Sequence, residues 1–359
     1  MDFFSYYVIP FIIVLGVLIF FHELGHFLAA KFFGVKVLKF SLGFGPKMIG
    51  KKVGETEYLI SLVPLGGYVK LLGENEDDTD ELTPSDEKRS FSNQHAIKRI
   101  IIVLAGPVFN LLLALFVFII FYMVAGEQVM IPEVGQVTDD SPAYRAGLQK
   151  GDVVVSIDNR SIETWSELKD VVGDCGGRSI EIVVKRNGQF LRFSVTPEES
   201  LTKNIFGEDV KSFLIGIVAS GKLKEVPLKP LDAIRAGFRK TWEVIDLTCV
   251  TIIKLLERVI PIKTLGGPIL IGQMTGELAK ENYAYLVPFM AVISINLGVL
   301  NLLPVPILDG GLIVFLLIEL VLRKPLSQRM RDHAQKFGLA LLILLMAVVI
   351  YNDVTRLLK

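Results

Sequence analysis

The segment Phe20-Phe21-His22-Glu23-Leu24-Gly25-His26-Phe27 contains an HExxH motif inside an apolar run from about Val8 to Ala30. Residues four apart share one face of a helix, so His22 and His26 can present two imidazoles to one metal ion. In zinc hydrolases, the glutamate of such a motif is the general base and is not a metal ligand. The alternative is a pair of interior histidines satisfied by hydrogen bonds. Ionisable residues inside a membrane-length helix are costly, which favours the functional interpretation.

The composition indicates a membrane protein. The chain has 359 residues, of which 51% are apolar, and its mean hydropathy is +0.51. The formal net charge is zero, so no basic surplus can neutralise phosphates, and we expect no nucleic-acid binding. Cys175 and Cys249 are far apart with no CxxC spacing, which argues against a thiolate metal site.

Four apolar segments are candidates to cross a bilayer, judged against the roughly 20 residues that a spanning helix needs. They are about Val8–Ala30, Ile100–Val124, Phe289–Leu322 and Phe337–Tyr351. The first lacks a basic start, so we expect a retained span and not a signal peptide. The third is too long for one straight span and contains two prolines and three glycines: Pro304, Pro306, Gly298, Gly310 and Gly311. It is therefore expected to break where it is buried in protein or lines a polar cavity.

Lysine and arginine predict the orientation of these spans. Both residue types are frequent between the first two spans and between the last two, so we expect both loops on the cytoplasmic side. The termini and the long middle region then lie outside. In this arrangement the HExxH motif and the broken third span reach the same side of the membrane.

The first loop contains the pattern of a small β-hairpin. Strands are expected over Val35–Phe40 and Tyr58–Val63, with Gly43, Gly45 and Pro46 as the turn between them, and Gly66–Leu71 continues the pattern. The sequence leaves two interpretations open: an ordinary cytoplasmic hairpin, or an edge strand that pairs with an extended substrate. The acidic run Glu74–Glu81 is expected to be a solvated loop.

A soluble segment follows the second span. Ser141-Pro142-Ala143, Ala146-Gly147-Leu148 and Gly151-Asp152 predict a short helix, its glycine end and a tight turn before the strand Val153–Ile157. This SPAxxAGLxxGD pattern resembles a PDZ domain. In that likeness Thr164–Val172 is the groove helix, Ile180–Lys185 and Phe190–Val195 are strands, and Leu214-Ile215-Gly216-Ile217 is the carboxylate-binding loop and groove strand in a circularly permuted order.

Apolar residues from Leu231 to Ile260 recur in steps of three and four, which predicts an amphipathic helix. We expect this helix to lie on the outer membrane surface, with a fifth span as the alternative.

Two imidazoles leave a catalytic zinc ion short of one protein ligand, since such sites usually supply three. Asp309, in Asn301-Leu302-Leu303-Pro304-Val305-Pro306-Ile307-Leu308-Asp309-Gly310-Gly311, is a carboxylate in an apolar run interrupted by helix breakers. The alternative is that Asp309 caps the next helix. Two imidazoles and a carboxylate favour zinc, although iron or cobalt would also fit.

These motifs together resemble the site-2 protease family of intramembrane zinc metalloproteases, specifically its bacterial RseP-type members. The likeness covers essentially the whole chain, with a single PDZ domain. It implies that His22, His26 and Asp309 are the zinc ligands, that Glu23 is the catalytic base, and that Asn301 holds the substrate backbone or the oxyanion. Gly106-Pro107 with Asn110 resembles the family's motif in the second span. Further candidates for substrate contact are Gly43, Phe44, Gly45, Pro46, Gly66, Gly67, Tyr68, Asn296 and Pro304, and for the PDZ groove Ile215, Gly216 and Ile217.

The expected fold is therefore an α-helical polytopic membrane protein with about four transmembrane helices, a membrane-associated β-hairpin and an inserted α+β PDZ domain. Its expected parts are residues 1–126, 127–222 (the PDZ domain), 223–282 (interfacial helices) and 283–359. The resemblance implies zinc-dependent cleavage of single-span membrane proteins, such as anti-sigma factors and remnant signal peptides, in the bacterial cytoplasmic membrane. A peptide C-terminus is a possible PDZ ligand. Two rivals are a non-enzymatic PDZ scaffold, which predicts a degenerate motif, and a metal transporter, which predicts internal repeats.

Overall fold

The computed structural model describes residues 4–74, 84–324 and 326–358. The chain divides into two compact units, and each is described by itself. Unit 1 is Met1–Phe121, Arg235–Ile253 and Pro261–Lys359, and unit 2 is Tyr122–Ile234 and Lys254–Ile260. The acidic run from Glu74 to Glu81 lies, apart from Glu74, outside the described residues.

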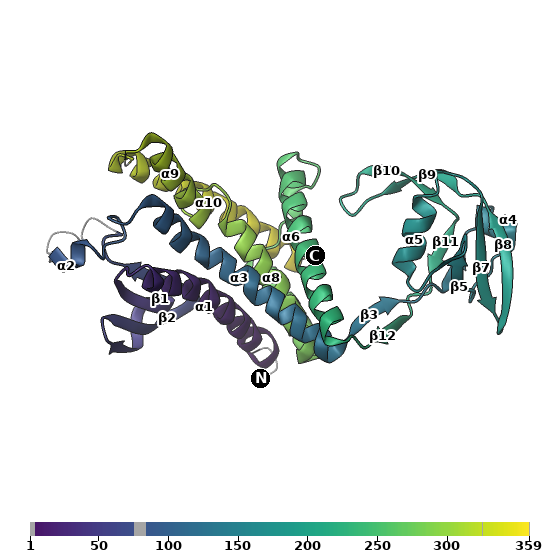
Figure 1. Ribbon diagram of the computed structural model, residues 1–359, viewed down its shortest axis with the longest axis horizontal. Coiled ribbons are helices and arrows are strands. Elements are labelled where there is room, and N and C mark those ends of the chain that lie inside the picture. Colours follow the sequence, from purple (N-terminus) through teal and green to yellow (C-terminus); the bar gives the residue numbers. More distant parts are fainter. Residues whose placement is uncertain (1–3, 75–83, 325, 359) are drawn as a thin grey trace. The chain divides into compact units, whose positions relative to one another are not determined.

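Unit 1 consists of helices and a β-hairpin (Figure 1). The principal helices are α1 (Ile9–Phe32, preceded by the π-helical turn η1, Phe4–Val8), α3 (Ala96–Ala125), α6 (Pro230–Leu256), α7 (Pro268–Glu281), α8 (Leu286–Asn301), α9 (Asp309–Leu322) and α10 (Gln328–Leu357). A short helix α2 (Pro84–Glu87) precedes α3. Four helical segments in the described part of the chain are long and apolar enough to cross a membrane: Phe4–Phe32, Ala96–Ala125, Tyr283–Asn301 and Arg329–Leu357. The expected four spans are confirmed.

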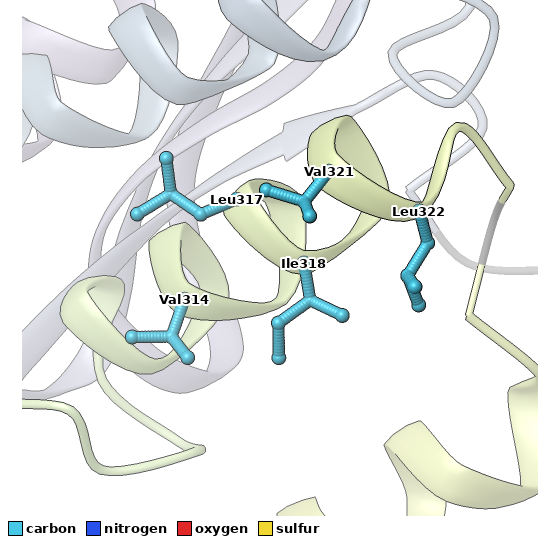
Figure 2. A pocket seen from close by; sticks show the side chains of 5 residues that line it. All are labelled: Val314, Leu317, Ile318, Val321 and Leu322. Atoms are coloured by element: carbon cyan, nitrogen blue, oxygen red, sulfur yellow. The ribbon is translucent and has the colours of Figure 1, made fainter.

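The third span breaks where the prolines predicted. Helix α8 ends at Asn301 and α9 begins at Asp309, with Pro304 and Pro306 in the turn between them. With 14 residues, α9 is only about 21 Å long, short of the roughly 30 Å hydrocarbon core. Five aliphatic side chains of α9 line a shallow hollow of about 310 Å³ (Figure 2): Val314, Leu317, Ile318, Val321 and Leu322. None of these side chains can carry out chemistry, and the face is typical of one that contacts lipid.

Helix α6 confirms the amphipathic helix expected after the inserted domain, and it is not among the candidate spans. Its location on the membrane surface remains a prediction.

The β-hairpin differs from the expectation in the position of its turn. Strand β1 is Val37–Val53, β2 is Thr56–Leu71, and the chain turns at Gly54-Glu55. The expectation that Gly43, Gly45 and Pro46 form the turn was wrong, because these residues lie within β1. The φ angles of Gly43 and Gly45 are +93° and +86°, values open mainly to glycine, and they bend the strand without ending it.

Because of these bends, the first part of β1 pairs with two different stretches of β2. Phe40 pairs with both Tyr58 and Val69, so the first part of β1 lies between two stretches of β2. The turn is fixed to the end of α1 through Glu55, which accepts hydrogen bonds from Arg89 and Lys31. Arg89 first, and Lys31 second, lower the pKa of Glu55 to about 2, so this anchor stays charged at physiological pH.

Unit 2 confirms the element order expected of the inserted α+β domain. Its four-stranded sheet has the order β6-β5-β7-β8 (Arg160–Ser161, Val153–Ile157, Ile180–Arg186, Gln189–Val195). Around it lie α4 (Pro142–Ala146), α5 (Trp165–Gly173) and the pairs β4–β11 (Val134–Val137, Ile217–Ala219), β9–β10 (Glu198–Lys203, Asp209–Leu214) and β3–β12 (Glu127–Met130, Leu223–Val226).

The predicted helix starts and ends in this unit also hold. Thr164 and Glu167 form a capping box at the start of α5, and Gly147 ends α4 with φ +91°. Ile215 is buried in the core of the unit and Gly216 has φ +80°, between β10 and β11. The Ser141 hydroxyl donates to the Gly216 carbonyl. The protein is thus a helical membrane protein with an inserted domain of PDZ type.

Candidate metal centre

The structure brings the two histidines of α1 and the first residue of α9 together. His22 Nε2 and His26 Nε2 lie 3.2 Å apart. Asp309 Oδ2 is 3.2 Å from the first of these atoms and 3.6 Å from the second. The three side chains are 12%, 14% and 20% exposed. Among the described residues, this is the group whose atoms could hold a metal ion.

The geometry of the cluster fits a zinc ion. Ligand atoms about 2.0–2.1 Å from a tetrahedral ion lie about 3.4 Å from one another, close to the three separations observed. Asp309 Oδ2 is buried and accepts no hydrogen bond. A buried oxygen in this state costs free energy unless another partner, such as a metal ion, binds it. Two neutral imidazoles and one carboxylate form a common donor set of catalytic zinc sites.

Helix α3 packs against α1 and contacts both histidines. His26 Nδ1 lies 2.9 Å from the carbonyl oxygen of Ile102. A Cβ atom on Gly106 would lie 2.2 Å from His26 Nε2, and one on Gly25 would lie 2.3 Å from the Ala105 carbonyl oxygen. The two glycines therefore allow α1 and α3 to approach closely enough to seat the imidazole. Asn110 lies one turn beyond Gly106, with its amide nitrogen 3.3 Å from His22 Nδ1.

Strand β2 of the hairpin lies against Glu23. The backbone of Val69 is beside the carboxylate of Glu23. A Cβ atom on Gly67 would lie 2.9 Å from Glu23 Cγ, so the absence of a side chain at this position makes room for the glutamate. Phe44 stacks on Tyr68 with ring planes 7° apart, and its ring covers Gly66.

A cavity of about 320 Å³ opens at the cluster. It is lined by Ile19, His22, Glu23, Phe44, Gly66, Gly67, Leu297, Asn301, Ile307, Leu308 and Asp309. The cavity thus joins the HExxH helix, the hairpin and both sides of the break in the third span. The aliphatic members of this lining were not predicted, because apolar residues are too common in the spans to stand out.

Several candidates for substrate contact lie elsewhere. Gly43, Gly45, Pro46, Tyr68, Asn296 and Pro304 are not among the lining residues. Asn296 instead faces α6, where its side-chain oxygen accepts a hydrogen bond from Thr248 at 2.7 Å, and Pro304 is exposed. Asn296 and Pro304 therefore lie outside the cavity, and their contact with substrate stays a prediction. Their proximity in sequence to Asn301 and Asp309 does not place their side chains on the same face.

An HExxH helix whose histidines meet a carboxylate in a group that could hold a metal ion, among helices long enough to span a membrane, is typical of membrane metalloproteases. The model of peptidase family M50 matches residues 10–345. The chain belongs to this family, the site-2 protease family, and is a zinc metalloprotease.

Relatives from several bacteria support this assignment over their full length. A protein of Mesorhizobium japonicum named as a predicted zinc metalloprotease is 36% identical and is covered over 97% of its length, with 96% of this chain. The zinc metalloprotease RasP of Geobacillus kaustophilus is 31% identical, with 97% of this chain and 98% of the relative covered.

The inserted unit has a solved counterpart of limited similarity. The PDZ domain of an SdrC-like protein from Listeria innocua is 25% identical and covers 25% of this chain and 92% of its own, with a TM-score of 0.20. A TM-score this low carries no conclusion about the fold, which rests on the element order instead.

Proposed function

We propose that the protein cleaves single-span membrane proteins within or near the membrane. The observation that carries this proposal is the cavity in which His22, Glu23, Asn301 and Asp309 lie beside the hairpin, between helices of membrane length. The membrane-length helices around the cavity favour a membrane substrate over a soluble one. A metal transporter would gain nothing from a strand placed against Glu23.

His22, His26 and Asp309 would hold the zinc ion. When bound, zinc supplies a Lewis acid that lowers the pKa of a water and polarises the substrate carbonyl. Glu23, one residue from His22 on the cavity side, would take the proton from the attacking water and pass it to the leaving amide nitrogen. The Asn301 amide, which also lines the cavity, would donate a hydrogen bond to the oxygen of the reacting carbonyl.

The substrate would enter this site as an extended strand. A peptide bond inside a helix is shielded, and unwinding it in a membrane leaves backbone groups without partners. The stretch Gly66–Val69 of β2 lies next to Glu23, and pairing with its edge would supply those partners. Phe44, Gly66 and Gly67 would contact the strand directly, and Gly43, Gly45, Pro46 and Tyr68 would shape the hairpin around it.

The orientation and physiological role belong to the same proposal. The distribution of lysine and arginine supports an orientation with the cleavage site toward the cytoplasm and the PDZ-type domain outside. The bacterial relatives support a location in the bacterial cytoplasmic membrane. Substrates resembling anti-sigma factors and remnant signal peptides would make the reaction a step of regulated intramembrane proteolysis. The loop Ile215-Gly216-Ile217 would bind a peptide C-terminus. The chain would divide into four parts, residues 1–126, 127–222, 223–282 and 283–359, so that peptide binding and cleavage take place in different parts.

The test compares the wild-type protein with Glu23→Gln in proteoliposomes that contain a single-span substrate. We expect Glu23→Gln to bind as much zinc as the wild type and to lose cleavage, since only the base is removed. Glu243→Gln, an exposed position on α6, is the matched control and should cleave normally. Wild-type protein that leaves every single-span substrate intact, or Glu23→Gln that cleaves at the wild-type rate, would contradict the proposal.

A further inference from the structure

Asn110 is a fully buried asparagine with one unsatisfied atom. Asn110 is 0% exposed, and its side-chain oxygen Oδ1 is buried without a hydrogen-bond partner. Its side-chain nitrogen Nδ2 lies 3.3 Å from Nδ1 of His22. An unmet acceptor at a fully buried site is rare and calls for a physical reason.

His26 shows what its partner histidine requires. His26 Nδ1 lies 2.9 Å from the Ile102 carbonyl oxygen, which can only accept, so Nδ1 carries the proton and Nε2 keeps its lone pair. That lone pair is directed toward Asp309 Oδ2 and His22 Nε2. A histidine that binds a metal through Nε2 almost always donates its other N–H to an oxygen in this way.

The same requirement applied to His22 conflicts with an amide nitrogen at Nδ1. If Nε2 of His22 is to offer a lone pair toward Asp309, Nδ1 must carry the proton, and two donors would then face each other. Oxygen and nitrogen of an asparagine amide have nearly the same shape, and their assignment follows from the hydrogen bonds they make. Rotating the Asn110 amide by half a turn brings Oδ1 to His22 Nδ1 and gives this oxygen its missing donor.

We infer that Asn110 is a positioning residue for the metal centre: its Oδ1 accepts the Nδ1–H of His22 and fixes the tautomer and the ring orientation of that ligand. This inference rests on the proposed role of His22 as a zinc ligand. Asn110 thereby does for His22 what the Ile102 carbonyl does for His26, and one helix, α3, supports both imidazoles.

Helix α3 is held firmly enough at this point for the role. The main-chain carbonyl of Asn110 accepts a hydrogen bond from the Ser294 hydroxyl of α8 at 2.8 Å. A Cβ atom on Gly298 would lie 3.0 Å from the Pro107 carbonyl oxygen, so α8 and α3 are in close contact here. The main chain of Asn110 is therefore held in place by contacts that do not involve its own side chain.

The test measures zinc affinity in the inactive Glu23→Gln background, by competition with a chelator, so that catalysis plays no part. Asn110→Leu keeps the branched shape of the side chain, although it is larger, and removes the acceptor, and we expect a loss of affinity of roughly 10–100-fold. Asn110→Asp keeps an acceptor of the same shape and should bind zinc at least as tightly as the parent. Asn352→Leu is the matched control, because Asn352 is a buried asparagine of α10 that bonds to Ile262, and its zinc affinity should not change.

The outcomes separate this inference from the proposed function. His22→Ala must lose zinc in the same assay, and if it binds zinc as the parent does, the ligand assignment itself fails. If His22→Ala loses zinc but Asn110→Leu keeps the parental affinity, only the role of Asn110 is overturned. Asn110→Asp decides the question if Asn110→Leu does not fold. An amide that donated to His22 could not be replaced by a carboxylate, so a large loss of affinity in Asn110→Asp would also overturn the inference.

Discussion

At the scale of single residues, the site depends on glycines as much as on ligands. Gly106 leaves room for the His26 imidazole, and Gly67 leaves room for Glu23. The sequence motif around Gly66 and Gly67 was recognised, but as a strand that contacts substrate. The close approach of Gly67 to Glu23 is a tertiary contact, and no local pattern in the sequence predicts it.

We predict that Gly67→Ala separates zinc binding from catalysis. The new methyl group would lie 2.8 Å from Ile19 Cγ2, 2.9 Å from Glu23 Cγ and 2.9 Å from the Ser41 carbonyl oxygen. The backbone oxygen cannot yield, so Glu23 must move, and a shift of about 1 Å at a reacting group can cost roughly 10²-fold in rate. Cleavage of a single-span substrate should fall by that order, with zinc content unchanged.

Gly16→Ala provides the matched control for this substitution. Gly16 lies on α1, the helix that carries Glu23, and a Cβ atom there meets nothing within 4 Å. The cleavage rate of Gly16→Ala should therefore equal that of the wild type. Equal cleavage rates for Gly67→Ala and the wild type would show that the position of the Glu23 side chain does not depend on the absence of a side chain at Gly67.

At the scale of elements, a buried ionic cluster fixes α9 against its neighbours. Glu319 of α9 has a side chain only 4% exposed. It accepts a hydrogen bond from Arg99 of α3 at 2.7 Å, another from Arg331 of α10, and one from the backbone amide of Leu326. Since Asp309 begins the same helix, this cluster helps to set the position of the Asp309 side chain relative to α3.

We predict that Glu319→Gln destabilises the protein strongly, because it removes the countercharge that Glu319 gives to the partly buried guanidinium groups of Arg99 and Arg331. Removing one partner of a buried pair typically costs roughly 3–5 kcal/mol. Unfolding of the solubilised protein by denaturant is the measurement. Lys240→Gln breaks an exposed ion pair with Glu243 and should cost less than about 1 kcal/mol. Equal stabilities for the two variants would mean that the cluster does not hold α9.

Elements differ in how far the sequence predicts them. The break between α8 and α9 was predictable because Pro304 and Pro306 interrupt an apolar run longer than one span. The path of the hairpin was not, because Gly43 and Gly45 can serve either as a turn or as bends within a strand. Only the pairing of Phe40 with two partners, Tyr58 and Val69, shows which one occurs.

At the scale of the whole molecule, 287 positions separate His22 from Asp309, and their meeting was expected from residue type and from the depth of each motif in its span. Sequence alone predicted His22, His26 and Asp309 as metal ligands and Glu23 as the base, and the structure brings the first three side chains together. The sequence did not predict the groups that hold the histidines in place, because a main-chain carbonyl such as that of Ile102 has no signature in a sequence. Nor could it show that Asn296 faces Thr248 and not the cavity, since α8 is apolar nearly all round.

The central claim is that α1 and α9 hold one zinc ion jointly. Zinc content, measured by atomic absorption on purified Asp309→Ala after dialysis against a weak chelator, tests it most directly, with Asp246→Ala on the exposed face of α6 as the control. We predict one zinc ion per chain in the wild type and in Asp246→Ala, and far less than one in Asp309→Ala. Full zinc occupancy in Asp309→Ala would contradict the account.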